Sequence, residues 1–568
     1  MNSTHAIALN LEKMHPILDI DSFNETQNLG GVYSVGLVSS PSFITVFSQQ
    51  KRAAYLAKCL REVLQNNENA GKKSAVKNTT LKIAIVGGGF AGLTLLKSLR
   101  TEMTSYLKGS NKRVHIDLFE QNPMLCSIQR GCSIRRIHPN VHLFPQDGWF
   151  KDTAEVANLQ MKAQSAGEYA KFLVENIVQE IREADAKNKL LEKKGVHCEV
   201  WQNTTYLKIQ NIEKKYALVA RGDVIENQWG DIKPSTKSES YEIIFIATGF
   251  GVEVSDDTIA NTSYWRNDQN GQVPLNSRAG KYMISGNGDG AVVDFLRLTL
   301  VDYQQDQTLK NILPFFKNER GIKHLNGDTE SDSLPSYLEE IIKDHYCRNN
   351  DISAKSRDTI VNSHKVLLEE FYRELTSFSQ EGSSKKNLAA VIDKYWGAIP
   401  EKLSEMASEK ASKKGSKSKI RNKKGLLELL TDYLIVPRLR QEIELILRLP
   451  AGGHGLLEQI IENTKVTFYN RVLFYLVWKQ AKQRIHLVSA TDFKTTDELL
   501  QFYGIPKANS IIRHGADSKI PRRKLGLDDI TYRHVLSFSE KQKIENKFEV
   551  NLNGYLINGD PISKNKIS

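Results

Sequence analysis

The sequence predicts an α/β protein with two strand–turn–helix units and a mainly helical C-terminal region. Two strand-like segments run directly into glycine-rich turns, at Gly87 and at Gly286, and an apolar helix pattern follows each turn. Three short strand-like runs lie between the two turns, at 196–201, 205–209 and 216–220, which is typical of a small antiparallel meander. At 568 residues the chain is long enough for roughly three domains.

The first turn has the spacing of a dinucleotide-binding loop. Gly87, Gly89 and Gly92 fit G-x-G-x-x-G. In this pattern the first glycine allows a tight turn, the second lets the backbone approach a pyrophosphate, and the third lets the helix pack closely on the strand. The next strand-like run, 114–120, ends in Glu120, where a carboxylate accepts the ribose hydroxyls. This order of elements predicts a Rossmann-like unit.

The second turn follows a strand-like run at 281–285. Gly286, Gly288 and Ala291 fit the relaxed spacing G-x-G-x-x-A. No strand that ends in an acid is evident after its helix, so the unit is predicted to be partial. Asp289 lies within the turn, where an inward carboxylate would repel a diphosphate. We therefore expect Asp289 to point away from the turn or to cap the helix.

The predicted organisation has four parts. They are an N-terminal helical extension and linker at 1–80, a Rossmann-like domain with an antiparallel meander at 81–275, a second nucleotide-binding unit at 276–335, and a mainly helical region at 336–568. The last part contains apolar helix patterns at 439–449 and 467–480. The aromatic residues of the second pattern are interpreted as core rather than as a cofactor or membrane contact.

Composition excludes some classes of protein. No apolar run approaches the roughly 18 residues of a membrane span, and the N-terminus lacks a secretory signal. The five cysteines have no pairwise spacing, which favours a reducing cytoplasm. No metal-binding site is predicted.

Most of the positive charge is local. Residues 410–424 hold eight Lys or Arg and no acid, and without them the net charge falls from +12 to +4. This segment has no aromatic residue to stack on a base, so it predicts a solvated loop, with a nucleic-acid arm as the alternative.

The order of these motifs over about 81–300 resembles that of the two-dinucleotide-binding flavoproteins. These include the pyridine nucleotide-disulfide reductase class and the flavin-containing and N-hydroxylating monooxygenases. Four blocks are more narrowly similar to bacterial FAD/NAD(P)-binding proteins of unassigned reaction: Phe47–Ala53, Ser133–Pro139, Tyr264–Asp268 and Ser285–Ala291.

The resemblance implies FAD at the first turn and NAD(P)H at the second. The residues that it places around FAD are Gly87, Gly89, Gly92 and Glu120, with Ala247, Thr248 and Gly249 on the strand beside it. Those that it places at the nicotinamide dinucleotide are Gly286, Gly288 and Ala291.

The sequence also departs from the disulfide reductases, whose two redox cysteines are separated by four residues. Here Cys126 and Cys132 are separated by five. This favours a monooxygenase that acts on a small amine. His138 is a candidate acid or base, or a residue that only hydrogen-bonds its loop. Arg136 is a candidate ligand of a phosphate or a substrate carboxylate, or simply a surface charge.

The favoured function is an FAD-dependent NAD(P)H oxidoreductase that acts on a small-molecule substrate. One alternative is a non-catalytic dinucleotide sensor or scaffold, which the partial second unit favours. Another is a flavin-dependent RNA-modifying enzyme that uses 410–424 as an RNA arm. The motif Arg513-His514-Gly515 is similar to that of phosphohistidine phosphatases, but it lies near the C-terminus rather than after a first strand, so no function is assigned to it.

Overall fold

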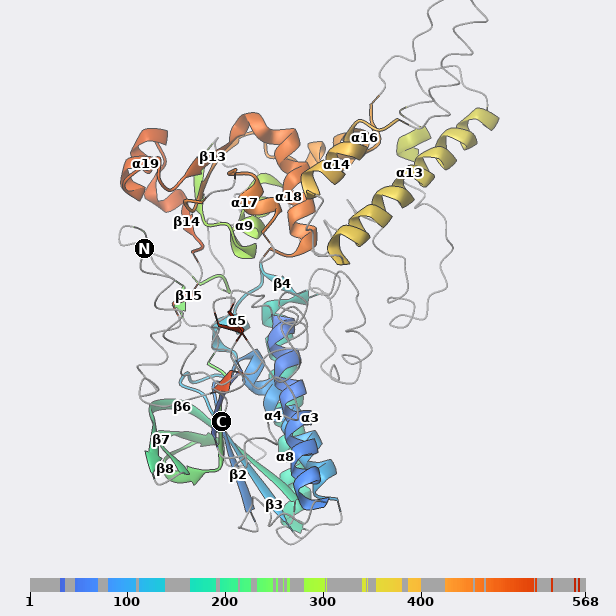
Figure 1. Cartoon of the computed structure of the whole chain (residues 1–568). Coiled ribbons are helices and arrows are strands. Elements are labelled where there is room, and N and C mark those ends of the chain that lie inside the picture. The colour runs from blue at the N-terminus through green and yellow to red at the C-terminus, as the bar shows by residue number, and fades with distance from the viewer. Residues whose placement is uncertain are drawn as a thin grey trace, which may run out of the picture. The chain divides into compact units, whose positions relative to one another are not determined.

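The computed structural model of the chain forms two compact units (Figure 1). The first unit comprises 1–135, 152–253 and 516–568, and the second comprises 136–151 and 254–515. The residues that the structure describes are 31–35, 46–69, 80–108, 112–137, 164–190, 195–212, 215–225, 232–248, 252–253, 259, 263–265, 280–301, 303, 340–343, 345, 354–380, 387–399, 424–452, 455–463, 466–514, 516–517, 533–534, 556–557 and 560–561. Among these residues, no helix has the length and apolar character needed to cross a bilayer.

The first unit is built on an eight-stranded sheet in the order β16-β1-β9-β2-β3-β6-β7-β8. The strands are parallel from β16 to β6 and antiparallel from β6 to β8. Their bounds are β1 Gly31–Ser34, β2 Thr80–Val86, β3 Arg113–Phe119, β6 Gly195–Ile212, β7 Lys215–Ile225, β8 Ile232–Tyr241, β9 Ile243–Ile246 and β16 Arg533–His534.

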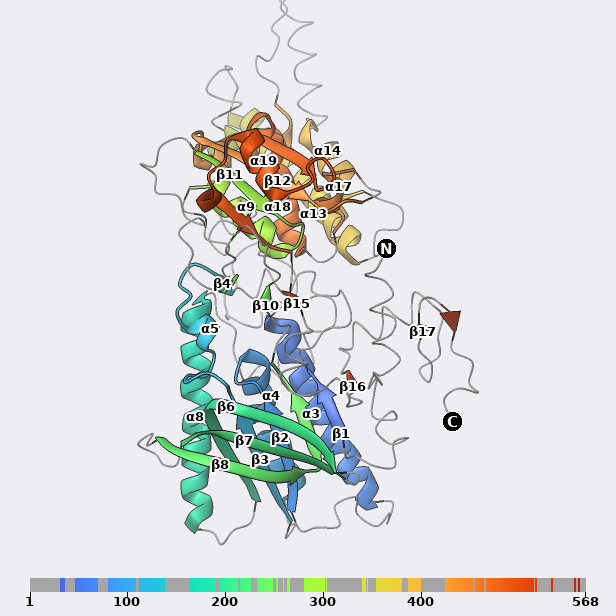
Figure 2. The ribbon, with the colours of Figure 1, turned by 90° about the vertical axis from the view of Figure 1, so that its left-hand side faces the viewer.

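Three long helices, α3, α4 and α8, pack together beside this sheet, and the meander lies on its other side (Figures 1 and 2). Lys82 on β2 forms an ion pair with Glu239 on β8, with 3.0 Å between Nζ and Oε2, which brings the meander back over the sheet. The helix bounds are α3 Val46–Asn69, α4 Phe90–Tyr106, α5 Ser127–Arg130 and α8 Ala166–Leu190. Short strands complete the unit: β5 Gln164–Ser165, β10 Val252–Glu253, β15 Ala516–Asp517, β17 Leu556–Ile557 and β18 Asp560–Pro561.

Two expectations for this unit need correction. The predicted N-terminal extension is part of the unit, because β1 pairs with β9 and α3 packs on α4. The predicted meander strands at 196–201 and 205–209 are one strand, β6, with a register shift between Gln202 and Tyr206. Its first half pairs in parallel with β3 and its second half pairs with β7, so one strand serves both parts of the sheet.

The second unit is built on a four-stranded, fully parallel sheet in the order β13-β12-β11-β14. The bounds are β11 Gly280–Ser285, β12 Ile443–Leu449, β13 Ile485–Ser489 and β14 Ser510–Ile512, with the short β4 at Arg136–Ile137. The helix predicted at 439–449 is therefore wrong, since most of this run is strand β12. Strands buried on both faces carry nearly continuous apolar residues, and in a short run such a pattern does not distinguish a strand from a helix.

Helices cover both faces of this second sheet. Alternate strand residues such as Ile284 and Leu447 face a core shared with α9 (Asp289–Thr299) and α18 (Phe468–Ala481). Their neighbours Met283 and Ile446 face a smaller core with α19 (Thr496–Tyr503) on the other side. The aromatic residues of α18 are buried, as predicted.

Within the region predicted to be a helical C-terminal part, 443–512 contains β12, β13 and β14, and the stretch before it is an insertion between α9 and β12. Its main helices are α13 Ala354–Gln380, α14 Leu388–Trp396 and α16 Leu426–Leu434, which lie together in Figure 1. They contribute to the core that α9 and α18 share. The remaining short helices are η2 Val436–Arg438, α17 Glu458–Ile461, η3 Lys482–Arg484 and η4 Lys507–Asn509. The second unit is thus not partial, because its sheet is completed by strands more than a hundred residues further along the chain.

Candidate functional site

Both units present a glycine turn at the carboxyl ends of their parallel strands. Counted from the strand before each turn, the sheet order is 3-2-1-4 in both units: β6-β3-β2-β9 in the first and β13-β12-β11-β14 in the second. This is the order of doubly wound nucleotide-binding sheets, in which ligands bind outside the carboxyl ends of the strands where the order reverses. The two turns are therefore the candidate sites.

Two glycines of the first turn are required by the protein itself. Gly87 has a φ of +116°, and a Cβ added there would lie 2.4 Å from the Ala247 carbonyl oxygen. A Cβ on Gly92 would lie 1.8 Å from the Gly87 carbonyl oxygen. Real side chains do not fit at such distances. These two glycines thus allow the tight turn and the close packing of α4 on β2, as the spacing predicted.

Gly89 is different, because the protein has room for a side chain there. It is the N-cap of α4 with a φ of −82°, and a Cβ added to it would meet no atom of the described residues within 4 Å. Neither backbone strain nor packing requires a glycine at this position. The free space lies at the N-terminus of a 17-residue helix, where unpaired amide groups attract anions. A dinucleotide diphosphate fits this arrangement.

Glu120 lies directly after β3 and is buried beside the turn. Its Oε2 accepts a hydrogen bond from the Gly88 amide at 2.7 Å, and its Oε1 accepts from the Asn122 amide and side chain at 2.8 and 2.7 Å. A carboxylate has about four acceptor positions, so one remains for a ribose hydroxyl. The structure therefore places Glu120 against the turn, as predicted, and holds it in a fixed orientation.

The strand beside the turn brings a further polar group. Ala247 follows β9, and its amide donates to the Val86 carbonyl at 2.7 Å. The next hydroxyl, Thr248 Oγ1, is buried and has no hydrogen-bond partner in the described part of the chain. Buried polar atoms are normally paired, so an unpaired hydroxyl at this edge fits a ligand group. Gly249, the third predicted residue of this strand end, lies outside the described residues.

The two cysteines near the turn are free thiols. Cys126 and Cys132 are both buried, and the Cys126 thiol lies 3.7 Å from the Gly88 carbonyl oxygen. Burial, followed by the Glu120 carboxylate, raises the pKa of Cys126 well above its ordinary value, while Arg130 acts in the opposite direction. A thiol with a raised pKa is a poor nucleophile. Cys126 therefore lacks the character of a redox-active group.

We expect the double substitution Cys126→Ser, Cys132→Ser to leave the NAD(P)H-dependent flavin reduction that the resemblance implies within about twofold of the wild-type rate, since both thiols are buried and Cys126 has a raised pKa. The measurement is the rate of flavin bleaching by NAD(P)H under anaerobic conditions. A melting curve of the same protein controls for loss of packing. If reduction is lost while the protein stays folded with its flavin, the two thiols take part in electron transfer.

The second turn repeats the geometry of the first. Gly286 has a φ of +136°, and a Cβ on it would lie 2.2 Å from the Arg513 carbonyl oxygen. Gly288 is the N-cap of α9 with a φ of −86°, and within the described part of the chain a Cβ there would meet nothing within 4 Å. Ala291 stands at the third position and is buried against the strand. Gly286 is thus structural, whereas the protein's packing leaves room beside Gly288, as it does beside Gly89.

Asp289 points away from this turn, as expected. Its Oδ1 accepts from the amide and hydroxyl of Thr467 at 2.9 and 3.0 Å and from the Asn470 side chain at 2.8 Å. These donors belong to the first turn of α18, whose N-terminus favours a negative charge. Asn463 also donates to the Asn287 carbonyl at 2.6 Å. The turn is therefore braced from outside, and its acid does not oppose a bound anion.

Two residues at the second turn, Arg513 and His514, belong to a motif to which no function was assigned from the sequence. They follow β14 and occupy the place that Ala247 and Thr248 occupy in the first unit: the Arg513 amide donates to the Ser285 carbonyl at 2.7 Å. The Ser285 hydroxyl lies 2.6 Å from His514 Nε2, and the Arg513 guanidinium donates to the buried Asp294 at 2.9 Å. The sequence feature that could have indicated this position is Arg-His-Gly after a short apolar run, which has the same arrangement as Ala-Thr-Gly after β9.

The second turn lacks a counterpart of Glu120. The Gly87 amide donates to the carbonyl of Phe119, the residue before Glu120. In the second unit the Gly286 amide donates to the carbonyl of Arg448, so the residue equivalent to Glu120 is the one after Arg448. The residue after Arg448 is Leu449, which is fully buried. Arg448 itself donates from Nη1 to the Thr496 hydroxyl at 2.7 Å. This strand end therefore offers a cation rather than a carboxylate.

The structure does not test the predicted catalytic roles of Arg136 and His138. Arg136 is half-buried in β4, within the second unit as the chain divides. His138 lies outside the described residues, as do residues 410–423 of the Lys-rich segment. Their predicted roles stay predictions.

No protein-family model matches the chain, and no curated protein matches it. Among solved structures, one similar chain is DfoA bound to FAD, the cadaverine monooxygenase of the desferrioxamine biosynthetic pathway from the fire blight pathogen Erwinia amylovora. The identity is 12%, the TM-score is 0.18, and the match covers 38% of this chain. The chain spans 46% of the length of that structure.

Proposed function

We propose that this chain is an FAD-dependent NAD(P)H oxidoreductase that binds FAD at the first glycine turn and NAD(P)H at the second. The observation that carries the proposal is the openness of Gly89 and Gly288. Each turn contains a glycine that backbone strain or packing requires, and a second one with free space at a helix N-terminus. A glycine that the fold does not need is explained by a ligand that approaches the backbone there.

The first unit holds the adenine dinucleotide part of FAD in this proposal. Amides at the start of α4 donate to the diphosphate, Glu120 accepts from a ribose hydroxyl, and the buried Thr248 hydroxyl supplies a further polar contact. When bound, FAD supplies the capacity to accept a hydride and to pass electrons onward. The residues of the chain bind it, orient it and exclude water from it.

The second unit holds the reductant. Gly288 leaves space for a diphosphate at the start of α9, and Asp289 is directed toward α18 rather than into that space. The acid that would select NADH through its ribose is replaced by Leu449, with the cationic Arg448 just before it. An arginine near this strand end accommodates a 2′-phosphate, so NADPH is the better fit of the two.

Within this class we favour a monooxygenase of a small amine over a disulfide reductase. The support is the state of the thiols, since Cys126 and Cys132 are buried and free and Cys126 is held protonated. His138 as acid or base and Arg136 as an anion ligand for the substrate belong to this proposal. Coupling of NADPH oxidation to amine hydroxylation, measured as product formed per oxygen consumed, separates a monooxygenase from a simple oxidase.

The rival function is a dinucleotide sensor without catalysis. Its main support was the partial second unit, and that support is removed by the four parallel strands of the second sheet. The deciding experiment starts with the absorption spectrum of the purified protein, where we expect flavin bands and one FAD per chain. Anaerobic addition of NADPH or NADH is then expected to bleach those bands. Bound flavin that neither nucleotide reduces, with or without candidate amines, favours the sensor.

A further inference from the structure

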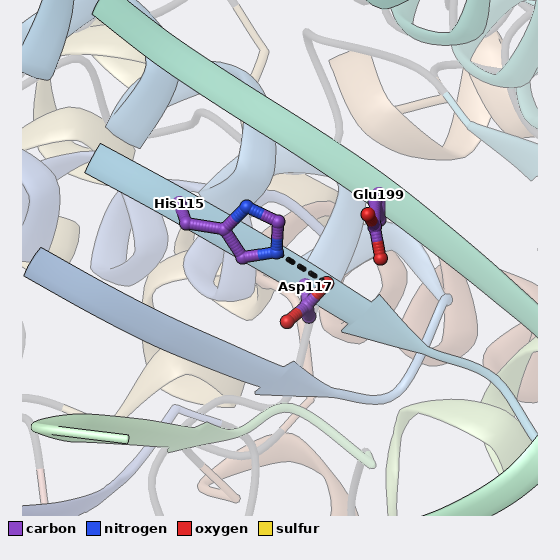
Figure 3. Close-up of side chains that lie close together, drawn as sticks. All are labelled: His115, Asp117 and Glu199. Carbon is purple, nitrogen blue, oxygen red and sulfur yellow. Dashed lines mark hydrogen bonds and ion pairs between the residues drawn. The ribbon is translucent and has the colours of Figure 1, made fainter. Parts of the chain in front are cut away.

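Four metal-ligand side chains gather on one face of the first sheet, away from the glycine turn. His115 and Asp117 lie on β3, and His197 and Glu199 lie on β6. The two strands pair in parallel with His115 opposite His197 and Asp117 opposite Glu199. Because side chains two residues apart share a face of a strand, all four lie on the same face. Figure 3 shows the side chains of His115, Asp117 and Glu199 converging.

The distances suit ligands of a single ion. His115 Nε2 lies 3.1 Å from Asp117 Oδ1, and His197 Nε2 lies 3.4 Å from Glu199 Oε1. The nearest ligand atoms of His115, Asp117 and Glu199 are all within 4.8 Å of one another. Ligands of a tetrahedral zinc ion at 2.0–2.1 Å are separated by about 3.3 Å. The Glu199 side chain is 31% exposed, so a change of rotamer can close the longer separation.

The buried carboxylate is already oriented as a metal ligand is. Asp117 has no exposed side-chain surface, and the Tyr241 hydroxyl donates to its Oδ2 at 2.6 Å. Oδ1 is thereby left facing His115. Hydrogen bonds of this kind from outside the ligand set fix ligand orientation in metal sites.

We propose that His115, Asp117 and Glu199, joined by His197, bind a divalent transition-metal ion, with Zn²⁺ as the best fit. Imidazole nitrogens favour zinc, iron and related ions over Mg²⁺ or Ca²⁺, and carboxylates complete a neutralising ligand set. A bound ion would offset the charge of the buried Asp117 and link β3 to β6 at the point where β6 leaves the parallel sheet for the meander. This site is independent of the proposed flavin chemistry.

The competing explanation is a set of ordinary histidine–carboxylate contacts. The second unit offers a matched example, in which His486 on β13 lies 3.2 Å from Glu444 on β12, and no third ligand joins this pair among the described residues. That pair also bridges parallel strands of a sheet. It serves as the control, because it has the same kind of histidine–carboxylate contact as the proposed site but lacks the cluster of three ligand side chains.

The test uses the full chain, stripped of metal with a chelator and exchanged into buffer, and titrated with Zn²⁺ by calorimetry. We expect one ion per chain and a higher melting temperature with zinc than without it. His115→Gln and Glu199→Gln are each expected to weaken binding at least about tenfold, since even losses outside the ligand set have such effects. Glu444→Gln is expected to bind zinc like the wild type.

The variants at His115 and Glu199 avoid the buried Asp117, whose loss is expected to unfold the sheet. The flavin content of the same samples is expected to be unchanged, which keeps this test separate from that of the proposed function. The proposal is overturned if the wild type takes up no zinc, or if both variants bind zinc as the wild type does, which would indicate adventitious binding elsewhere on the chain.

Discussion

Gly89→Val is expected to abolish stoichiometric FAD binding while the protein stays folded. A Cβ added at this position would meet no atom of the described residues within 4 Å, so folding should be little affected. It fills the space at the start of α4 where the diphosphate is proposed to lie. Overpacking of this kind costs about 1–3 kcal/mol, and the upper value corresponds to roughly 100-fold weaker binding. The measurement is the ratio of flavin to protein absorbance after gel filtration, with a melting curve to show folding.

Gly397→Val is the matched control for this variant. Gly397 also has a negative φ, at −97°, and open space around its Cβ position, but it ends α14 in the helical insertion rather than starting a helix after a strand. We expect this control to keep one FAD per chain. If folded Gly89→Val protein retains stoichiometric flavin, the assignment of FAD to the first turn is wrong.

Gly288→Val is expected to slow reduction of the flavin by NADPH about 100-fold or more while bound FAD is retained. The position is open in the protein, as Gly89 is, so the side chain should interfere only with a ligand at the start of α9. The measurement is anaerobic stopped-flow bleaching of the flavin over a range of NADPH and NADH concentrations. The same Gly397→Val protein is the control and should be reduced at the wild-type rate.

Each outcome of the Gly288→Val experiment has a distinct meaning. Loss of reduction with FAD retained supports a nucleotide site at the second turn. Wild-type reduction by the variant would place the reductant elsewhere on the chain. Loss of FAD from the variant would indicate that the second unit supports the first, and the two turns would then have to be assigned again.

Local features of the chain were predictable because they depend on neighbours in the sequence. The spacing of Gly87, Gly89 and Gly92 after a short strand fixed the type of turn, since φ, the helix N-terminus and close packing are all local requirements. The position of Glu120 after the next strand followed from the same pattern. The outward orientation of Asp289 was predicted from charge repulsion alone, and three hydrogen bonds to the start of α18 confirm it.

The second sheet was not predictable in the same way. Strand β12 lies far from β11 in the sequence. Its short run from Ile443 to Leu449 is apolar except for Glu444 and Arg448, and it was assigned to a helix. The long helical insertion separates α9 from β12, the next strand of the sheet, so the sequence did not indicate that β12 follows α9 in the fold. A periodic pattern identifies amphipathic helices such as α14 and α16, but it does not indicate which distant segment pairs with which strand.

The sequence by itself determined that this protein has two glycine turns, each joining a strand to a helix, because the conformation of a turn is decided within a few residues. Only the tertiary structure decided which side chains meet at those turns and at the sheet face. It brings His514 to Ser285 across 229 positions of the chain and sets His115 and Asp117 beside Glu199 through the register of two parallel strands. Pairing and register minimise the free energy of the whole sheet, and no short window of sequence contains that information.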